Sequence, residues 1–171
     1  MPTTVDKARV GVSKLLPPAN DDRLTASGTI LALPTSPTID PLAHGIRFLL
    51  VDSAGGTPVD VTIPGGGYDK LTKLGWTANA ALTTWRYRNA SASPVNGIKR
   101  VVLRAVPAVP GKYRWTVNGK NGTYAVDTAN LPLTAVLVID PPFAETGQCG
   151  ETAFGPAGCS IKAAGSTVMC K

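Results

Sequence analysis

Apolar and polar residues alternate with a period of two along most of the chain, which is typical of β-strands with one buried face. This alternation, or a short apolar run, occurs at 9–16, 29–33, 45–52, 59–63, 85–88, 98–106, 113–117 and 133–139. No stretch of about twelve residues has the period of 3.6 that indicates an amphipathic helix. The pattern therefore predicts about eight to ten short strands.

Two turns are predicted between these strands. The clearest hairpin spans 45–63, where an apolar strand and an alternating strand flank a Gly-containing turn at 53–56. Two Asn-Gly steps at 118–122 predict a second hairpin, because Asn and Gly adopt the positive φ of tight turns. Tyr124 and Val126 would return along its second strand. The segment 68–76 is predicted as a loop that holds one helical turn.

The fold class that follows is all-β. Gly and Pro account for 18 and 15 of the 171 residues, so turns are frequent, as in an antiparallel β-sandwich of jelly-roll or immunoglobulin-like type. A closed barrel and an α+β arrangement are the alternatives. No linker is long enough to divide domains. We expect a single sandwich domain over 1–171, of which 141–171 is a cysteine-containing C-terminal appendix.

The three cysteines all lie near the C-terminus. Cys159 and Cys170 flank a Gly-Ser turn, and two short strands around it would bring their Cα atoms to roughly 4.4–6.8 Å, as a disulfide requires. Cys149 is then unpaired or an alternative partner. Three buried free thiols are the other interpretation. No CxxC spacing supports a zinc or redox site.

Composition and the ends of the chain bear on compartment. An apolar fraction of 43% with 16% charged residues excludes a disordered chain. The apolar runs are too short to span a bilayer. The N-terminus has no signal peptide, so the chain is cytosolic or a mature or excised piece. Clustered cysteines favour export, and we expect an extracellular or cell-surface protein.

Residues for catalysis are sparse. His44 is the single histidine and lies in a turn before a strand. The sequence has no GxSxG motif that would supply a nucleophilic serine for which His44 could act as the base. The two glutamates, Glu145 and Glu151, lie in the cysteine-containing tail, and the glycines at 65–67 are not followed by the GK[ST] of a phosphate loop. Strand-end aspartates are explained as turn caps: Asp40, Asp52, Asp60, Asp69, Asp127 and Asp140. Calcium at 20–22 is a minor alternative. We expect no enzyme activity, no cofactor and no metal.

Charge is strongly segregated along the sequence. Ten lysines and arginines and no carboxylate lie between positions 70 and 126, whereas the formal net charge of the whole chain is +6. Strand parity places the cations of each strand on one face, opposite aromatic residues such as Trp85 and Trp115. The predicted anion- or partner-binding residues are Arg86, Arg88, Arg100, Arg104, Lys112 and Arg114. The alternative is a solvated outer face that is basic without a function.

Several anions would fit such a face. Nucleic acid is disfavoured, because stacking aromatics would have to share the face with the cations. An acidic polysaccharide, a lipopolysaccharide or an acidic patch on a second subunit fits better. Since the rest of the chain is net acidic, head-to-tail association into a filament or layer is possible, and free strand edges offer another route.

The chain also carries a weak pattern of short motifs. They are DPLAHGIRF at 40–48, IP at 63–64, GW at 75–76, WRY at 85–87 and CGE at 149–151. Together they resemble a β-rich domain that recurs in secreted proteins of environmental bacteria, over about residues 8–170. The resemblance implies export and a non-catalytic role and supplies no functional residues.

The function expected from the sequence is therefore a non-catalytic extracellular structural or interaction domain. We expect it to self-associate or to belong to a bacterial surface assembly. The alternative is a carbohydrate-binding module for an acidic polysaccharide, which would use the basic face together with exposed aromatic residues such as Trp76, Trp85 or Trp115.

Overall fold

The computed structural model describes residues 2–139, 141 and 145–171. Strands make up 48% of the structure and helices 10%, which confirms the all-β prediction. Asp140, which was predicted to cap a strand end, lies outside the described residues.

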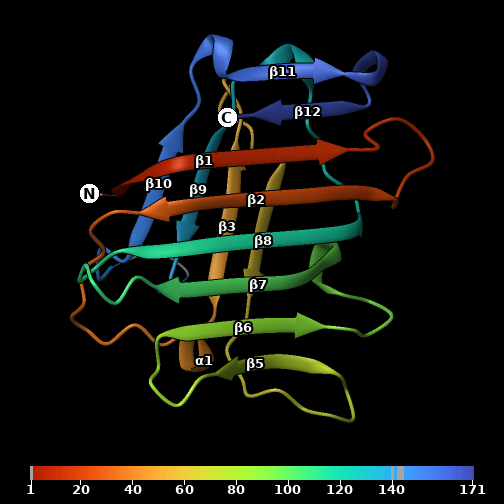
Figure 1. Ribbon diagram of the computed structural model, residues 1–171. Coiled ribbons are helices and arrows are strands. Elements are labelled where there is room, and N and C mark those ends of the chain that lie inside the picture. The colour runs from red at the N-terminus through yellow and green to blue at the C-terminus, as the bar shows by residue number, and fades with distance from the viewer. Residues whose placement is uncertain (1, 140, 142–144) are drawn as a thin grey trace.

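The described residues form twelve strands and a few short helical turns (Figure 1). The strands are β1 (Thr3–Ser13), β2 (Asp22–Ile30), β3 (Ile46–Val51), β4 (Val59–Ile63), β5 (Leu74–Ala78), β6 (Thr84–Asn89), β7 (Ile98–Ala105), β8 (Tyr113–Gly122), β9 (Thr134–Val138), β10 (Cys149–Ala153), β11 (Cys159–Lys162) and β12 (Thr167–Cys170). The helical turns are α1 (Pro41–His44), η1 (Val95–Gly97), η2 (Thr128–Asn130), η3 (Pro156–Gly158) and η4 (Ala163–Gly165).

These strands pair into one sheet that has a long limb and a short limb. The long limb has the order β11-β12-β1-β2-β8-β7-β6-β5, and the short limb has the order β10-β9-β3-β4. Figure 1 shows the short limb lying behind the long limb, with its strands crossing at a steep angle. β1 joins the limbs, because Thr3 and Thr4 pair with β10 while 10–13 pair with β12. A bulge between Asp6 and Arg9 interrupts β1 between these two regions, as expected where a strand bends.

The predicted two-sheet sandwich is not confirmed, because the strands form one curled, half-barrel sheet. The antiparallel prediction holds for the strand pairs of the described residues except β1–β10, which is parallel. The physical reason is that alternation reports only one-sided burial. A curled sheet buries its concave face in the same way as two separate sheets bury their inner faces.

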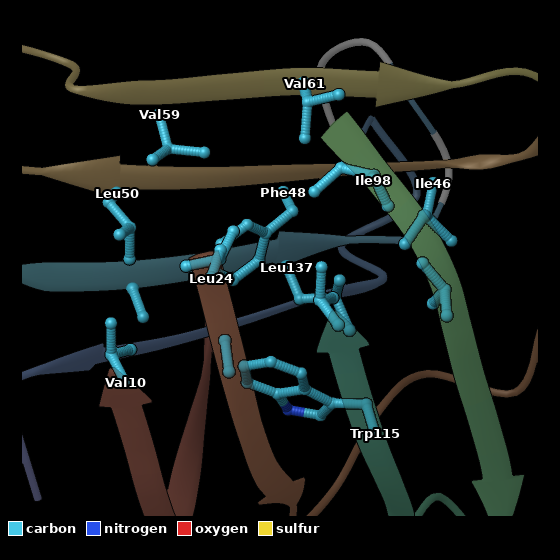
Figure 2. Close-up of a cluster of buried hydrophobic side chains, with 14 of the residues drawn as sticks. Val10, Leu24, Ile46, Phe48, Leu50, Val59, Val61, Ile98, Trp115 and Leu137 are labelled. Atoms are coloured by element: carbon cyan, nitrogen blue, oxygen red, sulfur yellow. The ribbon is translucent and has the colours of Figure 1, made fainter. Parts of the chain in front are cut away.

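The core fills the space between the two limbs. Figure 2 shows Phe48 of β3 and Leu137 of β9 facing Leu24 of β2 and Trp115 of β8, and all four are fully or almost fully buried. The rings of Phe48 and Trp115 have centroids 5.8 Å apart and pack tilted. Burying each such side chain contributes about 1.5–3 kcal/mol. This contact therefore fixes how the short limb closes over the long limb.

The predicted hairpin at 45–63 is confirmed. β3 and β4 pair antiparallel, with Ile46 opposite Ile63 and Leu50 opposite Val59. The Asp52 carboxylate accepts hydrogen bonds from the backbone N–H groups of residues 54 and 56, which closes the turn.

The predicted Asn-Gly hairpin is wrong, because β8 continues through both steps to Gly122. A Cβ on Gly119 would lie 2.1 Å from the Tyr124 hydroxyl, so this glycine makes room for a side chain rather than for a turn. The hydroxyl of Tyr124 in turn donates to the carbonyl oxygen of Asn96 at 3.0 Å. Tyr124 and Val126 are buried but do not belong to a strand.

Two other boundaries differ from the prediction. β2 occupies Asp22–Ile30 rather than 29–33, and β5 places Trp76 in a strand rather than in a loop. In β2 the inward positions include Ala26 and Gly28, which are too small to give a visible hydrophobic alternation.

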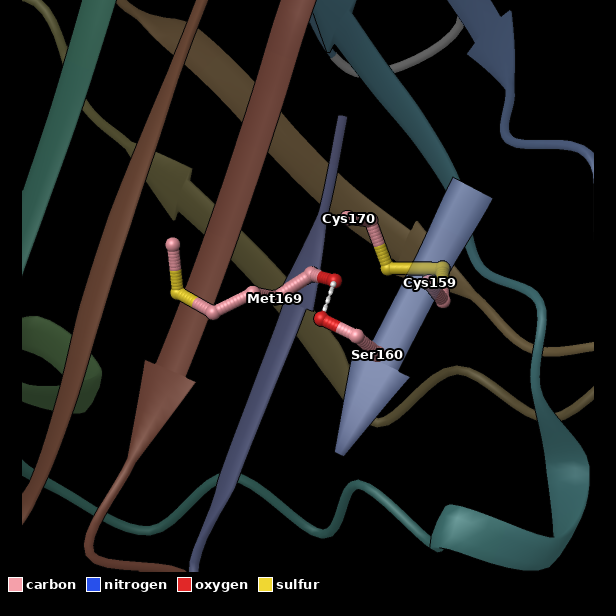
Figure 3. The surroundings of a disulfide bond; sticks show 4 residues. All are labelled: Cys159, Ser160, Met169 and Cys170. Atoms are coloured by element: carbon pink, nitrogen blue, oxygen red, sulfur yellow. Dashed lines mark hydrogen bonds between the residues drawn. A yellow bond between two sulfur atoms is a disulfide. The ribbon is translucent and has the colours of Figure 1, made fainter. Parts of the chain in front are cut away.

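The segment 141–171, expected as an appendix, supplies three strands that are all paired within the sheet. β10 lies between β9 and the start of β1, and β12 pairs with the rest of β1. The predicted disulfide is confirmed: Cys159 and Cys170 lie opposite each other on β11 and β12, with Cα atoms 4.0 Å apart (Figure 3). Cys149 is free and buried, and burial raises the pKa of its thiol.

Candidate anion-binding face

Three adjacent strands of the long limb present arginines on the surface that faces away from the core. Side chains alternate along each strand, so aromatic and aliphatic residues of β6, β7 and β8 point into the core. The intervening arginines are exposed. We call them the basic face: Arg86 and Arg88 of β6, Arg100 and Arg104 of β7, and Arg114 of β8.

The strand register places arginines directly opposite one another. Arg88 pairs with Arg100, and Arg104 pairs with Arg114. Directly opposed residues have Cβ atoms about 4.5–5.5 Å apart, and like charges in such positions destabilise a sheet. Each pair therefore costs roughly 0.2–1 kcal/mol of folding free energy.

Neither pair has a neutralising carboxylate partner. The ion pairs of the described residues are Lys14–Asp21 and Arg47–Asp60, and neither touches the basic face. The first carboxylate reached along the strand register from these pairs is that of Asp6. Arg114 of β8 lies opposite Thr29 of β2, and Thr29 lies opposite Asp6 of β1. Two strand spacings, about 10 Å, thus separate Asp6 from Arg114. At this distance physiological salt screens most of the attraction.

An open depression of about 600 Å³ lies over β5, β6 and β7, and we call it the arginine groove. Its lining includes Arg86, Arg88 and Arg100 together with Lys99 and the half-buried Tyr68. The Lys99 ammonium donates to the carbonyl oxygen of Ser91 at 3.2 Å. Among the described residues, no hydrogen bond or ion pair engages the three guanidinium groups. Their donors are therefore free to bind carboxylate, sulfate or phosphate oxygens.

The six predicted binding residues thus separate into three sets. Arg86, Arg88 and Arg100 line the arginine groove, and Arg104 and Arg114 form the adjoining opposed pair. Lys112 is half-buried before β8 begins, in a turn where its N–H donates to the carbonyl oxygen of Val109. It belongs neither to these strands nor to the groove lining.

Sequence reasoning missed Lys99 and Tyr68. Lys99 has the opposite parity to Arg100 and was not among the predicted binding residues. A bulge between Ile98 and Arg100 breaks the alternation there, and Lys99 lines the groove. No feature of the sequence marks this bulge. Tyr68 reaches the groove from the loop before β5, so only the tertiary fold brings it there.

The tryptophans do not provide a surface for stacking. Trp76, Trp85 and Trp115 are only 1%, 2% and 2% exposed, as strand parity predicted for Trp85 and Trp115, so they are not the exposed aromatics that the carbohydrate-binding alternative would use. The indole N–H of Trp76 donates to the carbonyl oxygen of Pro64 at 2.9 Å. These three side chains belong to the core, and a ligand on the outer face would meet arginines instead.

The remaining polar residues are accounted for by structure. His44 is exposed at the end of α1, which Asp40 caps through the N–H groups of Leu42 and Ala43. Asp69 and Asp127 also accept backbone hydrogen bonds in turns. The turn-cap prediction is wrong for Asp60, which lies within β4. Its carboxylate accepts a hydrogen bond from the Arg47 guanidinium at 2.6 Å, and this bond lowers the pKa of Asp60.

Each residue considered for calcium at 20–22 already has one side-chain oxygen engaged by the protein, although Asp21 Oδ1 is buried without a hydrogen-bond partner. Asp22 accepts from the N–H of Tyr124 at 2.7 Å, Asn20 accepts from the hydroxyl of Thr123, and Asp21 pairs with Lys14. Within the described ranges, no group of three or more histidine, cysteine or acidic side chains is placed to hold a metal ion.

Comparisons of the chain with protein-family models, curated proteins and solved structures find no match. None of the helices in the described part of the chain is long and apolar enough to cross a membrane.

Proposed function

We propose that this protein is an extracellular, non-catalytic interaction protein that holds a polyanionic partner on its basic face. One observation carries the proposal. Arg88 lies opposite Arg100, and Arg104 lies opposite Arg114, and neither pair has a carboxylate partner among the described residues. Such pairs cost stability, and an anion bound across them would remove the repulsion.

Two further features support this proposal. The Cys159–Cys170 disulfide is typical of proteins that work in oxidising compartments, which favours an extracellular location. The arginine groove is open and has four cations, Arg86, Arg88, Lys99 and Arg100, but no acid in its lining, which suits the repeated charges of a polymer.

The experiment is a salt series of binding to inorganic polyphosphate, followed by fluorescence anisotropy. The test variant carries Arg86→Gln, Arg88→Gln and Arg100→Gln. The control carries Lys162→Gln and Lys171→Gln, which remove two charges in β11 and directly after β12, away from the basic face. We expect the arginine variant to bind at least about tenfold more weakly, with a salt slope lower by about three. Equal losses in both variants would contradict the proposal.

Self-association is a second candidate, because the sheet does not close. β11 and β4 each pair with only one neighbour among the described strands, and a free edge can accept a strand from another copy. The outer edge of β5 is covered, because Trp76 exchanges backbone hydrogen bonds with Gly66 and Tyr68. Size-exclusion chromatography with light scattering tests this directly. We expect Ile161→Pro in β11 to lower the oligomer fraction, and a concentration-independent monomer would exclude this candidate.

A further inference from the structure

A second, smaller depression of about 300 Å³ lies on the same outer surface, over β12, β1, β2 and β8. We call it the hydroxyl groove, because its uncharged polar lining comes from Thr25, Ser27, Thr116 and Asn118; Arg9 and Met169 also line it. Gly11 forms part of its floor. A Cβ there would lie 2.8 Å from the sulfur of Met169 and 3.0 Å from the hydroxyl of Thr25, so a larger residue would push these side chains outward.

The sheet register joins the two grooves. One row of outward positions runs from Gly11 through Thr25 and Asn118 to Arg100 and Arg88. Asn118 in the hydroxyl groove is therefore directly opposite Arg100 in the arginine groove.

A second row runs parallel to the first. It passes from Arg9 through Ser27, Thr116 and Val102 to Arg86. From β1 to β6 there are four strand spacings, which make a track of about 19 Å across the strands.

The two halves of this track offer different chemistry. Ser27, Thr116 and Asn118 make no side-chain hydrogen bond to any described residue, so their donors and acceptors face solvent unused. The arginine half offers mainly positively charged donors, from Arg86, Arg88, Lys99 and Arg100, beside the hydroxyl groups of Tyr68 and Thr77. A ligand that matches both halves carries neutral hydroxyl groups as well as spaced carboxylates.

We propose that the track binds a linear acidic polysaccharide of the uronic-acid class, laid across the strands. Its carboxylates would meet Arg86, Arg88 and Arg100, and its hydroxyls would meet Ser27, Thr116 and Asn118. This inference rests on the proposed function and names its partner. A nucleic acid fits less well, because the tryptophans of these strands are buried and no row of exposed aromatic rings is available for its bases.

The test separates the two halves of the track. Variant H carries Ser27→Ala, Thr116→Ala and Asn118→Ala, and leaves every charge in place. Variant R carries the Arg86→Gln, Arg88→Gln and Arg100→Gln changes. Binding of both variants is measured with an alginate oligosaccharide, with inorganic polyphosphate and with oligothymidine.

We expect variant H to bind alginate about tenfold more weakly and to bind polyphosphate within about twofold of the unchanged protein. Variant R should lose affinity for both. Thermal unfolding checks that each variant folds, and Ser27→Ala and Thr116→Ala alone replace variant H if the triple change destabilises it.

Each outcome decides between the two proposals. If variant H binds alginate normally while variant R does not, the polysaccharide track is overturned and the basic face remains a binding site. If variant R binds all three probes as well as the unchanged protein does, the proposed function falls as well. Tighter binding of oligothymidine than of alginate would make nucleic acid the occupant and would also contradict the track.

Discussion

The opposed arginines predict that one charge reversal will make the protein more stable and a weaker binder. Arg100 lies opposite Arg88, so Arg100→Glu replaces a repulsive cross-strand pair by an attractive one. Removing the repulsion and adding the attraction are each worth roughly 0.2–1 kcal/mol. Because both side chains are exposed and screened, we expect a total gain of about 1 kcal/mol.

The matched control is Arg86→Glu. Arg86 lies opposite Val102 on one side and Thr77 on the other, so its reversal alters no direct arginine pair. The two variants change the same charge on the same face, and they make the same change in strand propensity.

The assay is thermal unfolding in low salt and in about 1 M salt. A gain of 1 kcal/mol corresponds to about 2–4 °C in Tm for a chain of this length. The advantage of Arg100→Glu over Arg86→Glu should disappear in high salt, where the Debye length is about 3 Å. If Arg100→Glu is no more stable than Arg86→Glu in low salt, the opposed-charge reasoning is refuted.

Three further predictions concern the fold. Replacing both Cys159 and Cys170 by Ser should lower the free energy of unfolding in urea by about 3 kcal/mol, because the disulfide spans a sequence separation of 11; no loss would mean that it contributes nothing. Gly28→Ala should cost about 1–3 kcal/mol, since the new Cβ would lie 2.4 Å from Val5, whereas Gly67→Ala, which meets no atom within 4 Å, should change stability little. Burial, with Asp22 nearby, raises the pKa of Tyr124 above that of the unfolded chain, so stability should fall as pH rises above about 10. Burial also raises the pKa of Tyr87 and Tyr113, so ultraviolet titration should show the phenol ionisation that accompanies unfolding reduced by one group in Tyr124→Phe; four phenols titrating before unfolding would contradict this.

The strands that the sequence predicts best are those with large apolar residues at alternate positions. β3, β4 and β7 carry Phe, Leu, Ile or Val on the buried face, and the hairpin of β3 and β4 follows from them. β2 was recognised only at its end, because Ala26 and Gly28 face the core and leave no apolar signal. The Asn-Gly steps misled for a related reason: Gly119 serves packing against Tyr124, which depends on a contact between separate elements.

The composition of the basic face could be read from the sequence, but its geometry could not. Parity correctly placed the arginines of β6 and β8 on the side opposite the aromatics. Which arginines oppose each other depends on strand register, and the bulge beside Arg100 is set by pairing with β8. The hydroxyl groove needs β8 beside β2 and β12 beside β1, and these strands are far apart in the sequence.

The most direct test of the central claim is a nuclear magnetic resonance titration that follows the arginine side-chain Nε–H signals while a polyanion is added. A protein of 17.7 kDa gives resolved spectra for this measurement. The account predicts that the largest shifts occur at Arg86, Arg88 and Arg100 and that they fade as salt is raised. Shifts that instead concentrate on the short limb, or no saturable shift at low salt, would contradict it.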